Sequence, residues 1–222
     1  MQPLIRKILA ASTVFAFIFL MLTAVQAQST SIGVKEGDWI EYSVVAAGSP
    51  PPEQDLNWAR IEILNVEGTI FHANFTVRYT NGSISSGVRT FNFSAGNVQA
   101  WIIIPANLNP SDYFYDSSIG NNVTIQGQLH KNVAGANREV TFTNTTERHK
   151  EWDKASGVYV ASIDNLGNYT INAQATATNM WRPQILGFDQ TLFMYILTVI
   201  IVIIVIIIAV VVAVWRKRKV KH

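Results

Sequence analysis

The stretch Phe71-His72-Ala73-Asn74-Phe75-Thr76-Val77-Arg78-Tyr79 determines the fold class that we predict for this chain. Apolar side chains occupy every second position, and polar side chains fill the positions between them. A period of two is typical of a strand with one face on a core and the other in water. An amphipathic helix would repeat its apolar residues every three or four positions instead.

Similar short segments recur on both sides of this strand. We predict further strands over Trp39–Val45, Ala59–Val66, Val88–Phe93, Ala100–Ile104, Val123–Leu129, Arg138–Asn144, Val158–Asp164 and Tyr169–Thr178. Hairpin turns are predicted at Glu67-Gly68, Asn81-Gly82, Lys154 to Gly157 and Asn165 to Gly167. Strands at this spacing, with no helical segment between them, indicate a mainly β domain. We expect an antiparallel meander wrapped into an open half-barrel or a sandwich.

Two stretches interrupt the alternation. Residues 47–53 contain three consecutive prolines and predict an exposed loop after the first strand. Residues 105–119 include Tyr113, Phe114 and Tyr115, which form a candidate contact surface because loops and aromatic side chains often make contacts. The alternative is that these aromatics fold back and close the open end of the sheet.

The C-terminal region predicts a transmembrane helix. Leu192 to Val214 contains no charged residue and is long enough to cross a bilayer as a helix over residues 192–215. The basic tail, residues 216–222, predicts a cytoplasmic end, because Lys and Arg beside a span are retained on that side. The segment before the helix is therefore expected to lie outside the cell, on a protein that crosses the cell membrane once.

The N-terminal region resembles a secretory signal. Arg6 and Lys7 precede an apolar run, and Val25-Gln26-Ala27 offers small side chains for cleavage after Ala27. We therefore predict a signal peptide over residues 1–27, an extracellular β domain over 28–182 and a juxtamembrane linker over 183–191. An uncleaved signal anchor is the alternative, and it leaves the β domain on the same side.

Charge and composition exclude several classes of function. Residues 28–191 hold ten Lys and Arg against fifteen Asp and Glu, which argues against binding nucleic acid through charge. The chain has no cysteine, so thiol catalysis, cysteine-ligated zinc and disulfides are excluded. We expect no cofactor.

Six N-x-S/T sequons stand in the predicted outer segment. They begin at Asn74, Asn81, Asn92, Asn122, Asn144 and Asn168. In a secreted chain these are candidate glycosylation sites. The alternative is that Asn and Thr are simply common in exposed turns and strand edges.

Catalytic and metal-binding signatures are absent from the sequence. The densest titratable cluster is His149-Lys150-Glu151-Trp152-Asp153. On a strand, His149, Glu151 and Asp153 share one face, which could hold a metal or a proton-transfer pair. The preferred interpretation is the solvated face of an edge strand with Trp152 pointing inward. We therefore assign no catalytic and no metal-ligating residue and expect no enzymatic activity.

Three motifs stand out: Gly37-Asp38-Trp39-Ile40-Glu41-Tyr42, Trp152-Asp153-Lys154-Ala155-Ser156-Gly157 and Thr178-Asn179-Met180-Trp181. With the C-terminal span, they resemble a family of uncharacterised archaeal cell-surface proteins that have a G-D-W-x-x-Y strand, a W-D-K-x-[ST]-G hairpin and a closing T-N-x-W. The resemblance implies an archaeal envelope setting and transfers no activity. We also expect Trp39 to anchor the core at the start of the first strand.

Three functions remain open. The first is a non-enzymatic surface glycoprotein that binds or packs against other envelope components, such as envelope proteins or surface glycans. The second is a carrier or sensor that holds an apolar ligand such as a lipid in a concave sheet. The third is an enzyme, which the lack of a catalytic constellation disfavours. A large apolar cavity would favour the carrier, and a filled core would favour the first function.

Overall fold

The computed structural model describes residues 31–99 and 101–219, so the predicted signal peptide lies outside the described residues. The β domain consists of β1 (Trp39–Gly48), η1 (Pro52–Gln54), β2 (Leu56–Glu67), β3 (Ile70–Tyr79), β4 (Ile84–Asn92), β5 (Tyr113–Asp116), β6 (Asn121–Thr124), β7 (Gly127–Val133), β8 (Ala136–Asn144), β9 (Arg148–Asp153), β10 (Tyr159–Asn165) and β11 (Tyr169–Thr178). A short hairpin of β12 (Gln184–Ile185) and β13 (Phe188–Asp189) then leads into helix α2 (Gln190–Lys219).

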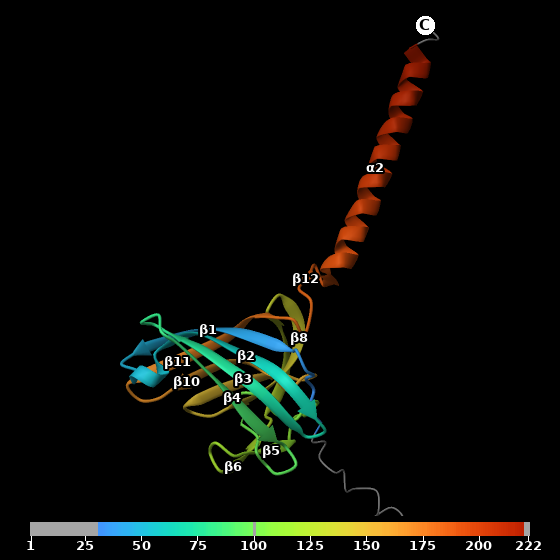
Figure 1. The fold of residues 1–222 in the computed structure, drawn as a ribbon. Coiled ribbons are helices and arrows are strands. Elements are labelled where there is room, and N and C mark those ends of the chain that lie inside the picture. The colour runs from blue at the N-terminus through green and yellow to red at the C-terminus, as the bar shows by residue number, and fades with distance from the viewer. Residues whose placement is uncertain (1–30, 100, 220–222) are drawn as a thin grey trace, which may run out of the picture.

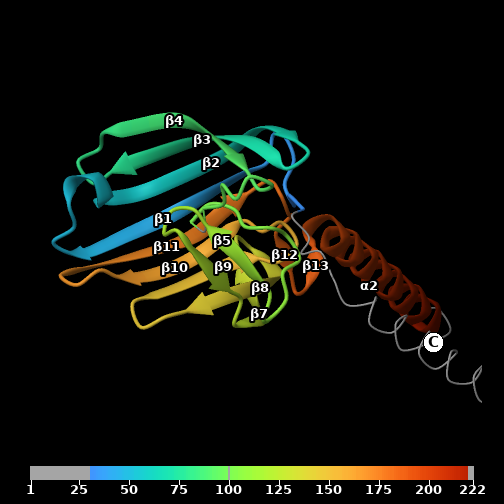
Figure 2. The same ribbon diagram turned by 90° about the horizontal axis from the view of Figure 1, so that it is seen from below.

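Nine strands form one antiparallel sheet in the order β4-β3-β2-β1-β11-β10-β9-β8-β7 (Figures 1 and 2). Two meanders, β1 to β4 and β7 to β11, are joined through the pairing of β1 with β11. The outer strands β4 and β7 do not pair with each other, so the sheet stays open. The predicted mainly β fold with an open antiparallel meander is confirmed, and the large sheet is a half-barrel rather than one layer of a sandwich.

The concave face of the sheet is covered by the chain itself. We call residues 101–126 the plug, because they connect the two meanders and lie over this face, with the β5–β6 hairpin in front of the sheet in Figure 2. The plug buries Ile102, Ile103, Ile104, Ala106, Leu108, Phe114 and Ile125. Backbone hydrogen bonds fix it to the sheet: the Ile104 amide donates to the Gly157 carbonyl at 2.9 Å, and the Tyr159 amide donates to the Ile102 carbonyl at 2.9 Å.

The plug corrects two strand predictions. The segment Ala100–Ile104 was expected to be a strand, but its described part, residues 101–104, forms only isolated bridges through Ile103. Its apolar residues fill the core instead of pairing in the sheet. The segment Val123–Leu129 was expected to be one strand, but it divides into β6 and β7 at the buried Ile125, where the chain passes from the plug into the sheet.

Trp39 is not a core residue. It is half-buried, and the Arg60 guanidinium lies 4.4 Å from the centre of its ring. Tyr42 occupies the core position on this strand, because alternation places Tyr42 on the concave face and Trp39 on the convex face. The expected core anchor at Trp39 is therefore wrong, although the opposite orientation of the two aromatics is as expected.

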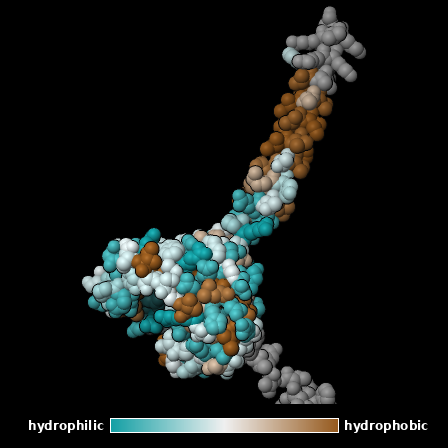
Figure 3. Space-filling model, in the orientation of Figure 1, coloured by the Kyte–Doolittle hydropathy of each residue, from teal (hydrophilic) through white to brown (hydrophobic). Residues whose placement is uncertain are grey.

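Helix α2 projects away from the β domain (Figures 1 and 3). Its segment Gln190–Val212 is long and apolar enough to cross a membrane, and none of its most apolar window is buried against the domain. The Asp189 carboxylate accepts a hydrogen bond from the Leu192 amide at 2.9 Å and so caps the start of the helix. The sequence prediction of one C-terminal apolar helix is confirmed.

Candidate functional site

The described residues form an apolar cleft and a polar pocket on the concave face beside the plug. The apolar cleft has a volume of about 180 Å³. Its walls come from the inward positions of β1, β2, β3, β10 and β11, together with Trp101 of the plug. The lining residues are Tyr42, Val44, Leu56, Ala59, Arg60, Ile61, Phe75, Val77, Trp101, Tyr159, Ile171 and Ala173.

Two buried tyrosines lie side by side in the lining of the apolar cleft. The Tyr42 hydroxyl donates a 2.7 Å hydrogen bond to the Tyr159 carbonyl, and the two rings lie 5.7 Å apart. Burial raises the pKa of Tyr42 and of Tyr159 well above the ordinary value for a phenol. Both tyrosines are therefore neutral at physiological pH, so the charge in the cleft lining comes from Arg60.

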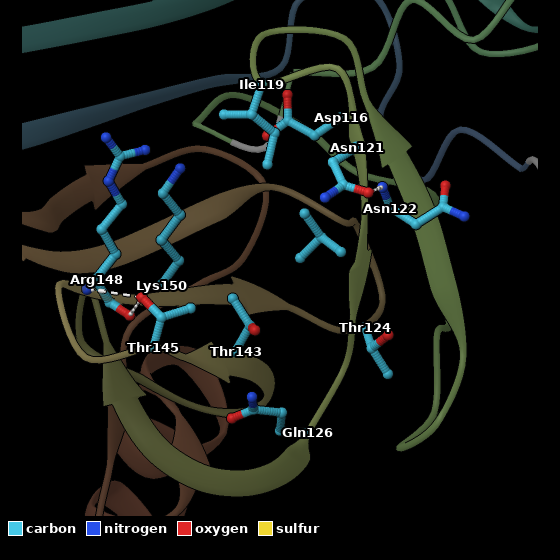
Figure 4. Close-up of a pocket in the computed structure, with 11 residues that line it drawn as sticks. Asp116, Ile119, Asn121, Asn122, Thr124, Gln126, Thr143, Thr145, Arg148 and Lys150 are labelled. Atoms are coloured by element: carbon cyan, nitrogen blue, oxygen red, sulfur yellow. Dashed lines mark hydrogen bonds between the residues drawn. The ribbon is translucent and has the colours of Figure 1, made fainter.

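The polar pocket has a volume of about 390 Å³ and lies between the β5–β6 hairpin and strands β8 and β9 (Figure 4). Its lining residues are Asp116, Ile119, Asn121, Asn122, Val123, Thr124, Gln126, Thr143, Thr145, Arg148 and Lys150. By residue type, amides, hydroxyls and three charged groups predominate in this set, although most of the exposed lining surface belongs to carbon atoms. The pocket can therefore donate and accept hydrogen bonds on opposite walls.

Two cations form one wall of the polar pocket. Arg148 and Lys150 are two residues apart on β9, so both project from the concave face, and Figure 4 shows their side chains next to each other. Burial lowers the pKa of Lys150, while the nearby carboxylates of Asp164 and Asp116 act in the opposite direction. Among the described residues, no carboxylate lies within ion-pair distance of the Lys150 ammonium.

Asp116 faces these cations from the plug. Its side chain is buried, and its Oδ1 atom accepts hydrogen bonds from the Ser118 amide at 2.9 Å and the Ser118 hydroxyl at 2.6 Å. Its Oδ2 atom has no hydrogen-bond partner among the described residues. A buried carboxylate oxygen without a donor is unfavourable, so a ligand that supplies a donor, directly or through water, would stabilise this arrangement.

His149, Glu151 and Asp153 of the predicted cluster lie on the other face of β9. Strand β9 is an interior strand between β8 and β10, so the interpretation as an edge strand is wrong. Glu151 and Asp153 are buried rather than solvated. Lys131 and His149 both contact Glu151, with the His149 contact at 2.9 Å, and Arg138 contacts Asp153 at 2.7 Å and 3.1 Å.

Lys131 with Glu151 and Arg138 with Asp153 are ion pairs on that face. Among the described residues, no group of three His, Asp or Glu side chains is placed to hold a metal ion. Trp152 points inward as expected, is fully buried and packs edge-on against Phe114, with ring centres 5.8 Å apart.

The three aromatics of the candidate contact surface separate into two groups. Phe114 is 4% exposed and belongs to the core, so it is not available to a partner. Tyr113 and Tyr115 alternate with it on β5 and are about half exposed. The contact surface is thereby reduced to these two tyrosines, beside the polar pocket.

The six sequons lie at different depths. Four of the asparagines, Asn81, Asn122, Asn144 and Asn168, are exposed, while Asn74 and Asn92 are half-buried. The Asn74 side chain accepts a 2.9 Å hydrogen bond from Ser86, and the Asn92 side chain accepts one of 2.7 Å from Ser94. The exposed four are therefore the more accessible acceptors for a glycan.

The three sequence motifs meet at the end of the sheet from which α2 departs. The Asn179 side chain accepts a hydrogen bond from the Trp39 amide and donates one to the Gly37 carbonyl, both at 2.8 Å. Gly33, which precedes the first motif, packs closely on the Asp153–Gly157 turn of the second. A β-carbon added to Gly33 would lie 2.5 Å from the Ala155 carbonyl oxygen. The contacts of Asn179 thus hold the end of β11 to the start of β1, its neighbour in the middle of the sheet.

Comparisons with known proteins leave the family open. No family model matches the chain, and no curated protein matches it. A solved structure of the siderocalin Ex-FABP, described as functioning through dual ligand specificities, matches with a TM-score of 0.23 and 10% identity, over 63% of this chain and 70% of that chain. Because that likeness is so distant, the binding site has to be argued from the residues of this chain.

The polar pocket was not identified from the sequence. Alternation on β9 does predict that Arg148 and Lys150 share one face of the strand, because His149 and Glu151 lie on the other. No local pattern pointed to Asp116, which reaches the pocket only through the path of the plug.

Proposed function

We propose that the chain is a non-enzymatic, membrane-anchored binding protein of the cell envelope. Helix α2 anchors it, the β domain lies outside the cell, and the basic tail, residues 216–222, lies in the cytoplasm. The apolar length of α2 and the clustered Lys and Arg after it support this topology. The motif resemblance favours an archaeal envelope.

The polar pocket is the proposed binding site, and its ligand is a hydroxyl-rich surface glycan of the envelope. The observation that carries this proposal is the placement of Arg148 and Lys150 on one wall and of the Asp116 carboxylate on the other, where its buried Oδ2 atom has no hydrogen-bond partner among the described residues. Sugar hydroxyls donate to carboxylates and accept from cationic side chains, so one glycan can use both walls. The volume of about 390 Å³ falls within the range of small-molecule sites, roughly 300–1,000 Å³.

The test is titration of the full-length protein, in lipid nanodiscs, with glycans released from the host envelope. Arg148→Ala and Lys150→Met should each weaken binding. Arg78→Ala is the matched control, because it removes one positive charge from an exposed position on β3 outside the pocket. Equal losses in all three variants would reduce the interaction to net charge and contradict the assignment of the pocket.

A carrier function is the second candidate, because the apolar cleft is lined almost entirely by apolar side chains. Its volume of about 180 Å³ is below the usual range for ligand sites, since the plug fills the rest of the concave face. Native mass spectrometry of the purified protein distinguishes the two functions. Lipid that stays bound to the β domain after detergent exchange, and is lost on Ala173→Trp, would favour the carrier.

A further inference from the structure

The segment between the β domain and α2 is a hairpin with an apolar tip. Strands β12 and β13 pair Gln184 with Asp189 and Ile185 with Phe188, and Leu186-Gly187 forms the turn. Leu186 is 83% exposed, and Ile185 and Phe188 are also exposed. The hairpin thus exposes three large apolar side chains on six residues, a concentration that the surfaces of soluble domains normally avoid.

The residue at the tip does not suit an aqueous turn. Leu186 and Gly187 both have positive φ angles, 53° and 84°. Two-residue hairpin turns of this kind strongly favour Asn-Gly or Asp-Gly, because a short polar side chain tolerates the left-handed conformation. A leucine there is both strained and exposed to water. In a lipid environment the leucine side chain would no longer be exposed to water.

The hairpin is fixed at both ends. At its base, the Gln184 amide donates to the Gly135 carbonyl at 2.7 Å, and the Gln184 side chain accepts from the Asn137 amide at 3.0 Å. At its other end, Asp189 caps α2, and both hairpin strands lie beside the start of the helix. The apolar tip is therefore held close to the place where α2 leaves the domain (Figure 1).

We propose that the β12–β13 hairpin inserts Leu186, together with Ile185 and Phe188, into the outer interface of the bilayer beside α2. The partner of this surface is lipid, because the hairpin lies against the start of α2, whose apolar segment is long enough to cross a membrane. The hairpin gives the β domain a second membrane contact and sets its orientation. This inference rests on the proposed anchoring by α2.

The cysteine-free chain allows a direct test by site-directed spin labelling. Leu186→Cys is labelled with a nitroxide in the full-length protein, reconstituted in phosphatidylcholine nanodiscs. Collisions with dissolved oxygen report lipid, and collisions with a water-soluble nickel chelate report water. Leu166→Cys is the control, because Leu166-Gly167 lies in the turn between β10 and β11, at the end of the sheet opposite α2 (Figure 2). Leu166 is half-buried there, and its φ angle is not positive.

We expect the ratio of oxygen to nickel collisions to be several-fold higher at position 186 than at position 166. An equal ratio at the two positions would overturn the proposal. Ile203→Cys, in the middle of α2, separates this failure from a failure of the anchor: lipid exposure at 203 with water exposure at 186 rejects the hairpin contact alone. Ile185→Cys repeats the measurement without changing the turn, and an unchanged melting temperature confirms that each variant is folded.

Discussion

Asp153 shows how a charge can be buried in this domain. Its carboxylate accepts hydrogen bonds from the Arg138 guanidinium at 2.7 Å and 3.1 Å, and from the amide and hydroxyl of Ser156 at 2.9 Å and 2.7 Å. The Arg138 guanidinium also lies 4.8 Å from the centre of the Trp181 ring. The Asp153 carboxylate thus links Arg138 on β8 with Ser156 in the turn after β9, and Arg138 in turn contacts Trp181 at the end of the domain.

Asp153→Ala should destabilise the domain by about 3–5 kcal/mol, the usual range when one partner of a buried ion pair is removed. Arg138 then keeps its charge without a partner, and the turn loses its acceptor for Ser156. Chemical denaturation of the full-length protein in detergent measures the change. Glu139→Ala is the matched control, because the Lys154–Glu139 pair is partly exposed and contributes about 0–1 kcal/mol. A loss of similar size in both variants would contradict this account.

Lys150 should give the folded domain a characteristic pH dependence. Its pKa is lowered from the ordinary value of 10.5 by burial. Between the lowered pKa and 10.5, the unfolded chain holds this proton and the folded chain does not, so stability rises with pH in that window. Below the window, the ammonium is charged in both states and its desolvation opposes folding.

Lys150→Met removes this contribution. The variant should therefore be more stable than the parent near neutral pH, and the difference should shrink as the pH rises toward the ordinary lysine pKa of 10.5. Denaturation midpoints of both proteins across that range test the prediction. A difference that stays constant or grows with pH would show that burial does not lower the pKa of Lys150.

At the residue level, alternation predicted faces but not partners. It placed Trp152 inward, and it placed His149, Glu151 and Asp153 together on the opposite face. It did not predict that Lys131 and Arg138 would pair with these carboxylates, because those cations come from neighbouring strands whose register is a tertiary property.

The plug depends on a close approach at Gly157. A β-carbon on this residue would lie 2.0 Å from the Ile104 carbonyl oxygen, and its φ angle is 71°. Only glycine combines that conformation with that contact. Gly157 therefore lets the plug pair with the turn between β9 and β10.

Gly157→Ala should cost at least about 3 kcal/mol, because strain and overpacking act together. Gly167→Ala is the matched control: its φ angle is 83°, but nothing lies within 4 Å of the added carbon. Left-handed strain alone should cost about 1–2 kcal/mol there. Thermal unfolding of both variants checks the order, and equal losses would rule out the tight contact with Ile104.

Among the elements, the regular strands were predictable and the plug was not. Residues 101–104 have the composition of a strand, and composition cannot tell a strand from an apolar segment that covers a sheet. The hairpin turns were correctly predicted because Gly68, Gly82, Gly157 and Gly167 all adopt positive φ angles, which glycine tolerates.

For the molecule as a whole, the proposed topology makes a direct prediction. Protease added to intact cells should degrade the region Gly37–Trp181 and spare the tail, residues 216–222, because only the β domain lies outside. Immunoblotting with antibodies to each region follows the two parts. Permeabilised cells serve as the control, in which the tail becomes accessible. Protection of the β domain in intact cells would contradict the orientation.

The choice between half-barrel and sandwich could not be made from the sequence. It depends on β1 pairing with β11, whose residues are more than a hundred positions apart, and on β4 and β7 staying unpaired. The local alternation of apolar and polar residues predicts neither the β1–β11 pairing nor the unpaired edges. The apolar run of α2, in contrast, needs no tertiary context to be recognised, since its length and composition suffice.

The antiparallel pairing of β1 with β11 also determines how the domain bears mechanical load. The anchor is attached at the Thr178 end of β11, and the far end of β1 is Gly48. Tension between the membrane and a partner held near Gly48 pulls the two strands along their length, so it loads their cross-strand hydrogen bonds together, in shear. Tension between the membrane and a partner held near Trp39 opens the same bonds one after another. The force needed to separate β1 from β11 is therefore greater when the partner is held near Gly48 than when it is held near Trp39.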